Sequence, residues 1–323
     1  MSHSLDTMIN ITVLSPKSEF TQTQQARLAK LGQVNYVKKH IEYPLHKIIE
    51  LAKNSNILAF EPDIVGGFEN APKKLRQLMT AMPKIKGLAL DTSRFDYVDK
   101  KYCNEKEITV THVPHCFTES VAEHTLSLLL GCAKRLFQTD RKTQKGKYQL
   151  NRGFELKGKT LGIIGLGHIG SRMAELGLAI GMKVIAWNRT PKRKKGVKIE
   201  SLNNVLTQSD AISLHLTNCS KTRSFLSTKR IALLKKGVII VNTSGRDLID
   251  EKAMAKALES GKIDTYAFEA DELDSPPLGS LENAVIFKGF GWFTKEALEK
   301  NKETWVKNIE GIVKGKSSVD KAF

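Results

Sequence analysis

The sequence predicts an α/β protein with two doubly wound parallel-sheet domains. Three observations support this prediction. The chain has 323 residues, 41% of them hydrophobic, which suits two domains of ordinary size better than one small core. Short apolar stretches alternate with helix-like segments along most of the chain, as in a parallel sheet covered by helices. Between residues 160 and 170 an apolar run breaks into glycines and then resumes as a helix pattern.

The first part of the chain has the pattern of a small α/β domain. Five short apolar stretches predict strands, at residues 9–14, 34–37, 57–60, 87–90 and 108–112. Three segments with apolar residues at three- and four-residue spacing predict helices, at residues 21–31, 45–52 and 72–79.

One long helix is predicted over residues 119–137, and we expect it to link the two domains. Ser120 and Glu123 have the spacing of a capping box at its start. Val121, Leu126 and three leucines at 128–130 supply much of its apolar surface. Residues 141–153 are polar and basic and predict a connection to the next strand.

The glycine-rich run predicts a strand, a tight turn and a helix. Gly165 permits the turn, Gly167 lets the backbone approach a pyrophosphate, and Gly170 allows close helix packing. His168 and Ile169 open the helix, whose first N–H groups would face the phosphates. A second strand is predicted at residues 183–187, which favours a Rossmann dinucleotide site over a purely structural glycine turn.

The alternation of strands and helices continues to the end of the chain. Strands are predicted at residues 211–216, 238–241, 266–268 and 284–287. Helices are predicted at residues 202–206, 226–234, 251–260 and 294–313.

The formal net charge of +17 raises the question of an acidic partner. Lysines are scattered along most predicted helices, with one dense cluster at residues 192–195, and we find no nucleic-acid motif. No apolar run is long enough to span a membrane and no signal peptide is recognisable, so we expect a cytoplasmic protein without a nucleic-acid or membrane partner. The four cysteines lack metal or CxxC spacing and are expected to be reduced.

Several motifs in order resemble the D-isomer-specific 2-hydroxyacid dehydrogenases over nearly the whole chain. They are Thr118 to His124, Gly165 to Gly170, Leu214 to Leu216, Lys221 to Arg223, Val241 to Ser244 and Asp250 with Glu251. The resemblance implies two Rossmann-like domains with the active site in a cleft between them. A substrate domain would comprise residues 1–117 and the C-terminal helix 295–323, and a cofactor domain residues 118–294. It also implies hydride transfer between a nicotinamide and a 2-keto or 2-hydroxy acid, and a homodimer formed through the cofactor domain.

The sequence departs from the family pattern at the expected catalytic arginine and histidine. Gly245 stands in the arginine position, and Arg246, one place on, either reaches the cleft or is solvated. Gly289 stands in the position of the histidine that donates a proton. Lys288 beside it offers an alternative acid or anion anchor, or is an ordinary surface lysine.

At the positions of the family's two carboxylates this chain also has acidic residues, but their side chains differ in length from those of the family. The substrate loop is changed as well. Glu269 aligns with the family aspartate and Asp274 with the family glutamate. Arg94 lies where the family has small residues, and it either binds a substrate carboxylate or pairs with a neighbouring aspartate. His124 lies near the domain junction and is expected to be packed or solvated more often than catalytic.

The turn after the second Rossmann strand favours NADP. Asn188 replaces the acid that usually binds the adenosine ribose, and Arg189 and Thr190 offer charge and hydrogen bonds to a 2′-phosphate. A solvated basic turn that leaves NAD as cofactor is the alternative. The resemblance adds further cofactor contacts at Leu216, Thr217, Thr222, Thr243, Ser244, Gly245 and Glu269.

Two functions are therefore open. The first is an NADP-dependent oxidoreductase with a rewired active site, which reduces a small substrate other than the usual 2-keto acid. The second is a catalytically inactive homologue in which the nucleotide is a structural or sensing ligand. The retained carboxylates favour the reductase, and the missing arginine and histidine favour the binding protein.

Overall fold

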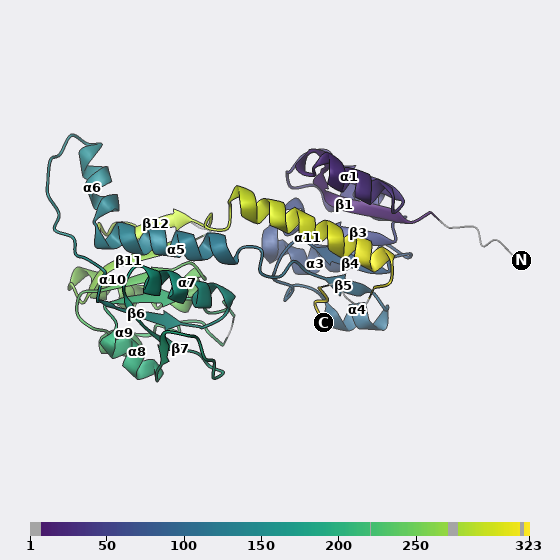
Figure 1. The fold of residues 1–323 in the computed structure, drawn as a ribbon. Coiled ribbons are helices and arrows are strands. Elements are labelled where there is room, and N and C mark those ends of the chain that lie inside the picture. The colour runs from purple at the N-terminus through teal and green to yellow at the C-terminus, as the bar shows by residue number, and fades with distance from the viewer. Residues whose placement is uncertain (1–7, 220, 271–276, 317–319) are drawn as a thin grey trace, which may run out of the picture. The chain divides into compact units, whose positions relative to one another are not determined.

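The computed structural model describes residues 8–219, 221–270, 277–316 and 320–323. The chain divides into two compact units. Unit 1 comprises Met1–Cys116 and Lys295–Phe323, and unit 2 comprises Phe117–Thr294. Each unit has a parallel sheet with helices on its faces (Figure 1), which confirms the α/β, doubly wound fold class.

Unit 1 contains a five-stranded parallel sheet. Its strands have the order β2-β1-β3-β4-β5, which is the flavodoxin-like order. In this order the chain changes direction between β1 and β3, so loops diverge at the carboxyl ends of these strands. The strands are β1 (Asn10–Pro16), β2 (Gln33–Val37), β3 (Ile57–Phe60), β4 (Gly87–Leu90) and β5 (Thr109–Thr111).

The helices of unit 1 include the C-terminal helix of the chain. They are α1 (Gln22–Ala29), α2 (Leu45–Ala52), α3 (Gly67–Thr80), α4 (Lys100–Glu105) and α11 (Lys295–Val313), with short 3-10 turns η1 (Lys17–Glu19) and η2 (Pro62–Val65). On α11, Trp305 is fully buried and its indole N–H donates to the carbonyl of Ala89 at 2.8 Å. A Cβ on Gly87 of β4 would lie 2.3 Å from the side chain of Ile312. The last helix is therefore packed closely against the unit 1 sheet.

Unit 2 contains a seven-stranded parallel sheet. Its strand order is β12-β11-β10-β9-β6-β7-β8, the Rossmann order extended by one strand. The strands are β6 (Thr160–Ile164), β7 (Lys183–Trp187), β8 (Val197–Ile199), β9 (Ala211–Leu214), β10 (Val238–Asn242), β11 (Ile263–Ala270) and β12 (Ala284–Lys288). Between β6 and β9 the strand order reverses, and doubly wound folds bind ligands outside the carboxyl ends of strands at such a point.

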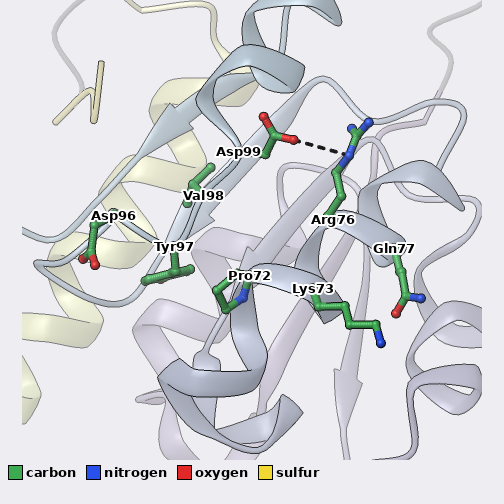
Figure 2. A pocket seen from close by; sticks show the side chains of 8 residues that line it. All are labelled: Pro72, Lys73, Arg76, Gln77, Asp96, Tyr97, Val98 and Asp99. Atoms are coloured by element: carbon green, nitrogen blue, oxygen red, sulfur yellow. Dashed lines mark ion pairs between the residues drawn. The ribbon is translucent and has the colours of Figure 1, made fainter.

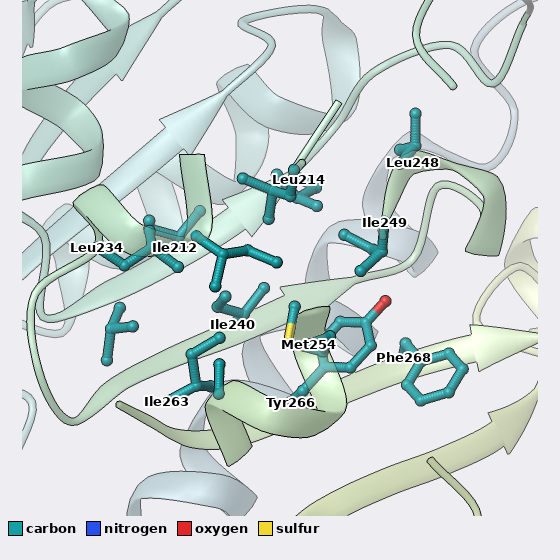
Figure 3. Packing of buried hydrophobic residues seen from close by; sticks show 14 of the residues in the cluster. Ile212, Leu214, Leu234, Ile240, Leu248, Ile249, Met254, Ile263, Tyr266 and Phe268 are labelled. Carbon is teal, nitrogen blue, oxygen red and sulfur yellow. The ribbon is translucent and has the colours of Figure 1, made fainter. Parts of the chain in front are cut away.

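Helices cover both faces of the unit 2 sheet. Along β10, Ile239 and Val241 belong to the core on one face, whereas Val238 and Ile240 belong to the core on the other. Figure 3 shows the second core, in which Ile240 packs near Met254 and Tyr266. The first face is covered by α5 (Thr118–Ala133) and α7 (His168–Ala179), and the second by α8 (Leu202–Gln208), α9 (Thr228–Leu233) and α10 (Glu251–Glu259).

The prediction of a single helix over residues 119–137 is wrong, because helix α5 ends at Ala133. Arg135 has φ 60°, in the left-handed region, and a second helix, α6 (Leu136–Thr143), follows it. The Arg135 guanidinium binds both carboxylate oxygens of Asp264 at 2.5 and 2.7 Å and the hydroxyl of Thr265 at 3.2 Å. This contact with β11 holds a backbone conformation that local helix propensity does not favour.

Other element boundaries differ from the prediction by smaller amounts. Helix α3 begins at Gly67 rather than Pro72, so the proline lies inside the helix, where it lacks an N–H to donate. Strand β11 extends well beyond residues 266–268 at both ends. Leu226 lies outside α9 and forms a parallel bridge with Ile249. Helix α4 and strand β8 are short and were not predicted.

Cys103, Cys116 and Cys132 are buried, Cys219 is exposed, and no disulfide joins them in the structure. Among the helices in the described part of the chain, none has the length and apolar character needed to cross a membrane.

Candidate functional site

The glycine-rich loop of unit 2 lies between β6 and α7, as the sequence predicts. Gly165 has φ 100°, and a Cβ there would lie 2.3 Å from the carbonyl oxygen of His215. A Cβ on Gly170 would lie 2.0 Å from the carbonyl oxygen of Gly165. Both positions therefore require glycine, the first for the turn and the second for the close approach of helix to strand.

Gly167 differs from these two glycines because the space beside it is open. A Cβ there would have no atom within 4 Å in the described structure. Gly167 precedes the first residue of α7, and the first N–H groups of a helix have no acceptor inside it and attract anions. An open backbone cradle at a helix N-terminus fits the pyrophosphate of a dinucleotide.

Asn188 follows β7 and supports the glycine loop from the neighbouring strand. Its side-chain oxygen accepts from the backbone N–H of Leu166 at 2.8 Å, and its amide nitrogen donates to the carbonyl of Thr190 at 2.6 Å. The side chain expected beside the ribose therefore braces the loop and its following turn. Arg189 and Thr190 are exposed, and Arg189 forms no ion pair with any residue that the structure describes.

The turns after β9 and β10 bring further predicted cofactor residues to the same edge of the sheet. The hydroxyl of Ser244 donates to the carbonyl of Leu214 at 2.9 Å, which links the ends of the two strands. The hydroxyl of Thr222 donates to the carbonyl of Thr217 at 2.6 Å and closes the turn after β9. The half-buried residues at this edge are Leu216, Thr243 and Ser244, whereas Thr217 is exposed.

His215 lies partly buried beside the glycine loop and serves the fold. Burial lowers its pKa to about 3, so its imidazole is neutral. Its Nε2 lies 2.7 Å from the hydroxyl of Ser213, and its backbone N–H donates to Ile164 at 2.8 Å.

Gly245 and Arg246 occupy a tight turn in which a side chain at residue 245 would be strained. Gly245 has φ 150°, and a Cβ there would lie 2.8 Å from the amide nitrogen of Asn218. The guanidinium of Arg246 binds Glu251 of α10 through both carboxylate oxygens. These guanidinium N–H groups, which could bind a substrate carboxylate, therefore point toward α10.

His124 and Glu269 form a close pair at the carboxyl end of β11. His124 Nε2 lies 3.2 Å from Glu269 Oε1, an ion-pair distance without the alignment of a hydrogen bond. The side chains are 12% and 11% exposed, respectively. The same carboxylate oxygen accepts the backbone N–H groups of Phe290 and Gly291, both at 2.8 Å. The carboxylate thus fixes both the imidazole and the turn that follows β12.

The surroundings of Glu269 keep its carboxylate ionised. Burial alone would raise its pKa, but the His124 ring and the two backbone N–H groups outweigh this effect and lower it. A carboxylate that stays ionised stabilises an imidazolium beside it, so this pair has the electrostatics of an acid–base dyad.

The turn after β12 packs directly on the His124 ring. A Cβ on Gly291 would lie 2.6 Å from ring carbon Cδ2, and the rings of Phe290 and His124 meet edge to face with centroids 4.7 Å apart. Ser120 donates to the carbonyl of Gly291 at 2.5 Å, so it does not cap α5 and the predicted capping box with Glu123 is wrong. These contacts leave the imidazole little freedom to rotate.

The other predicted catalytic residues have different surroundings. Lys288 is the last residue of β12 and is exposed. Arg94 belongs to unit 1 and binds Asp96 through two nitrogens at 2.9 and 3.0 Å. Asp274 lies outside the described residues. Among the predicted catalytic residues that the structure describes, Glu269 is paired with a group suited to proton transfer, the imidazole of His124.

An open pocket of about 480 Å³ lies on unit 1, between α3 and residues 96–99 (Figure 2). Its Arg76 pairs with Asp99 at 3.4 Å. The pocket contains none of the predicted site residues, and its charged groups are largely paired, so we assign it no chemistry.

Comparison with known proteins identifies the family. A family model described as the NAD binding domain of D-isomer specific 2-hydroxyacid dehydrogenases matches residues 126–287, which are 162 of the 323 residues. The chain belongs to this family. The family members are oxidoreductases that use a nicotinamide cofactor, in agreement with the glycine loop.

Curated relatives and solved structures match most of the chain. A hydroxypyruvate reductase of Thermotoga maritima is 35% identical over 237 residues, which cover 71% of this chain and 78% of the relative. A glyoxylate reductase of Aeropyrum pernix is 33% identical over 256 residues, which cover 74% and 76%. An acyclic imino acid reductase, solved in complex with NADPH and D-Arg, has a TM-score of 0.81 at 25% identity and covers 98% of this chain and 100% of that one.

His124 is the residue that sequence reasoning undervalued. It lies 145 positions from Glu269 along the chain, and a lone histidine on a helix carries no local sign of its partner. The sequence shows that His124 ends the run Thr118 to His124, but the run does not predict where the side chain points.

Proposed function

We propose that the protein is an NADPH-dependent reductase in which His124 and Glu269 perform the acid–base chemistry. The His124–Glu269 pair carries this proposal, because it supplies a histidine held by a carboxylate where Gly289 has removed the usual one. NADPH, when bound at the glycine loop, would supply a hydride. The protein would then supply the proton, exclude water and hold the substrate.

The substrate class that fits best is a 2-imino acid, whose carbon–nitrogen double bond is reduced to an amine. An imine nitrogen takes up a proton near neutral pH, whereas a ketone oxygen does not. Reduction of an imine therefore depends less on a single well-placed acid than reduction of a ketone does. The similarity to an imino acid reductase solved with NADPH supports this choice.

His124 would protonate the imine nitrogen before hydride transfer, and Glu269 would stabilise the imidazolium and then face the iminium charge. Hydride addition to the iminium carbon leaves a neutral amine nitrogen, and the histidine regains its proton from solvent. The buried position of the pair strengthens these electrostatic effects.

The test is NADPH oxidation, followed by absorbance, with a panel of 2-keto acids in the presence and absence of ammonium. We expect turnover only when ammonium is present, because only then does an imine form. Equal rates with and without ammonium would instead identify a ketone reductase.

The binding-protein alternative has its own support in the structure. Gly245 cannot be replaced by the family arginine without strain, and Arg246 is directed to Glu251. Tight NADPH binding without turnover on any keto acid or imine of the panel would favour this alternative.

We expect NADPH to bind at least about tenfold tighter than NADH, which corresponds to about 1.4 kcal/mol. Arg189 is exposed beside the ribose end of the site, and Asn188 presents no anion to repel a 2′-phosphate. Calorimetric titration with both nucleotides measures this ratio. Arg189→Ala should bring the two affinities together, whereas Arg230→Ala, whose guanidinium lies on the Phe225 ring, should not. An NADH preference in the unsubstituted protein would refute the assignment.

We also expect a symmetric homodimer formed through unit 2. Helix α6 and the chain that follows it stand out from the rest of this unit (Figure 1) and carry Leu136, Tyr148 and Leu150 with 58%, 91% and 83% exposure. Apolar side chains so exposed are typical of an interface. Light scattering at micromolar concentration should give twice the chain mass, and Tyr148→Ser with Leu150→Ser should shift it toward the monomer. A monomer before substitution contradicts the expectation.

A further inference from the structure

Residues 320–323 lie along the outer edge of the unit 1 sheet. In the described sheet β5 is the last strand and pairs with β4 alone. Lys321 forms an antiparallel bridge with Thr111 of β5, and the backbone N–H of Ala322 donates to the carbonyl of Val110 at 2.9 Å. The end of the chain, marked C in Figure 1, accordingly lies in unit 1 beside β5. The segment covers backbone groups that an edge strand would otherwise expose.

The same segment holds the backbone of His112, the residue that follows β5. The N–H of His112 donates to the carbonyl of Asp320 at 2.9 Å, and its carbonyl accepts from the side-chain amide of Asn308 at 2.7 Å. Asn308 Oδ1 accepts the N–H of Asp320 at 3.3 Å. Asn308 lies on α11 and is only 2% exposed, so its amide has a fixed orientation. These bonds fix the position of His112 relative to residues 320–323 and α11.

Residues 91–96 form the substrate loop, which directly follows β4. The strands of unit 1 are parallel, so this loop lies at the carboxyl edge of the sheet, where doubly wound folds bind ligands. The side chain of Arg94 is 51% exposed, and its guanidinium lies 4.8 Å from the centroid of the Phe68 ring. The loop therefore presents a guanidinium to solvent at this edge.

The chain after β5 binds the substrate loop at three points. His112 Nδ1 lies 3.2 Å from the carbonyl oxygen of Ser93, and the N–H of Val113 donates to the carbonyl of Thr92 at 3.0 Å. The rings of His112 and Phe95 meet edge to face, with centroids 4.9 Å apart. His112 thus connects the loop, through its side chain, to residues 320–323, through its backbone.

Phe323 contacts the substrate loop directly. The centroids of the Phe323 and Phe95 rings are 6.4 Å apart, within the range of an aromatic pair. The ammonium of Lys100, at the start of α4, lies 4.9 Å from the centroid of the Phe323 ring. Ala322 and Phe323 are partly buried and pack against the core of unit 1 that contains Tyr97. Phe323 therefore lies between the loop and α4.

We propose that residues 320–323 form a strap that fixes the substrate loop in the conformation that binds the substrate. His112 and Phe323 are its positioning residues, because they act through the loop. A surface loop without such contacts opens locally at little cost, and ordering it on binding lowers affinity. The strap removes part of this cost in advance. The part of the loop in substrate binding rests on the proposed reductase function, whereas the hold on the loop does not.

Hydrogen exchange measured by mass spectrometry on the full chain tests the hold on the loop. The amides of Val98 and Val113 donate to the carbonyls of Phe95 and Thr92 in the loop, so their exchange reports its opening. Phe323→Ala should speed this exchange by about two- to tenfold, the factor that an aromatic contact is typically worth.

Two further variants separate the ring contact from general damage. Phe323→Leu retains an apolar side chain and should restore most of the protection at Val98 and Val113. Lys321→Ala is the matched control, since it changes an exposed side chain of the strap and leaves the backbone bridge to Thr111 in place. Exchange in α7 of unit 2 should be the same in all variants.

Steady-state kinetics with the imine substrate test the effect on binding. Phe323→Ala should raise KM by about two- to tenfold, in step with the exchange, and Phe323→Leu should restore it. The kcat and the affinity for NADPH should stay within about twofold, because the glycine loop, His124 and Glu269 all belong to unit 2. A loss of folded protein would instead lower the apparent kcat and leave KM unchanged.

Unchanged exchange at Val98 and Val113 in Phe323→Ala would overturn the strap. Faster exchange with an unchanged KM would overturn its part in substrate binding. Exchange needs no turnover, so the comparison decides whether the strap holds the loop even if the unsubstituted protein reduces no imine, an outcome that would count against the reductase alone.

Discussion

Replacing His124 with asparagine should slow imine reduction by about 100-fold at pH 8 and above, the lower end of what a positioned acid contributes. The imidazole is the group that can give a proton to the substrate, and Glu269 Oε1 lies 3.2 Å from its Nε2. The deficit should shrink as the pH is lowered, because the imine then takes its proton from water. A substitution that damaged only the fold would slow the reaction at every pH.

The experiment compares pH profiles of turnover for the unsubstituted protein, His124→Asn and a control. Glu123→Gln is a suitable control, because it changes the exposed neighbour of His124 on the same helix. NADPH affinity should stay within about twofold in all three proteins, which is about 0.4 kcal/mol. A parallel downward shift of the His124→Asn profile, without any recovery at low pH, would count against the role of proton donor.

Simple 2-keto acids such as pyruvate, glyoxylate and hydroxypyruvate should be reduced very slowly or not at all in the absence of an amine. The resemblance to the family places its catalytic arginine and histidine at positions where this chain has Gly245 and Gly289. The loss of the acid alone typically lowers the rate by about 10²- to 10⁴-fold. The loss of a bidentate carboxylate contact adds to this effect, although groups that act as a unit do not give additive losses.

Absorbance measurements with protein whose NADPH binding has been verified determine these rates. Turnover within the usual enzyme range of about 1 to 10³ per second on any of the three acids would refute the expectation. Lys288→Ala and Arg246→Ala would then show which side chain has replaced the missing groups.

The glycine loop could be predicted from the sequence because its determinants are local. Gly165, Gly167 and Gly170 lie within six residues. Gly165 and Gly170 have steric reasons that follow from the turn itself, and Gly167 leaves open space beside the backbone. The strands of both sheets except β8 were predicted for a similar reason, since a strand buried on both faces is a continuous apolar run. The break at Arg135 was missed because its cause is an ion pair with Asp264, 129 positions away.

The side-chain partners in the candidate sites were beyond sequence reasoning for the same reason. Glu269 was named as catalytic, but only the fold brings it to His124 and to the turn after β12. The contacts of His40 with Glu19 and Glu61 likewise join three separate segments of unit 1. Asn188 was expected to affect the nucleotide directly, and the structure adds its contact with Leu166.

Hydride transfer itself gives the most direct test of the proposed function. The protein is incubated with NADPH carrying deuterium at the transferable position, a 2-keto acid and ammonium, and the products are analysed by mass spectrometry. We predict an amino acid with one deuterium on its α-carbon. A 2-hydroxy acid carrying the deuterium, or no deuterated product while NADPH is bound, would contradict an imine reductase.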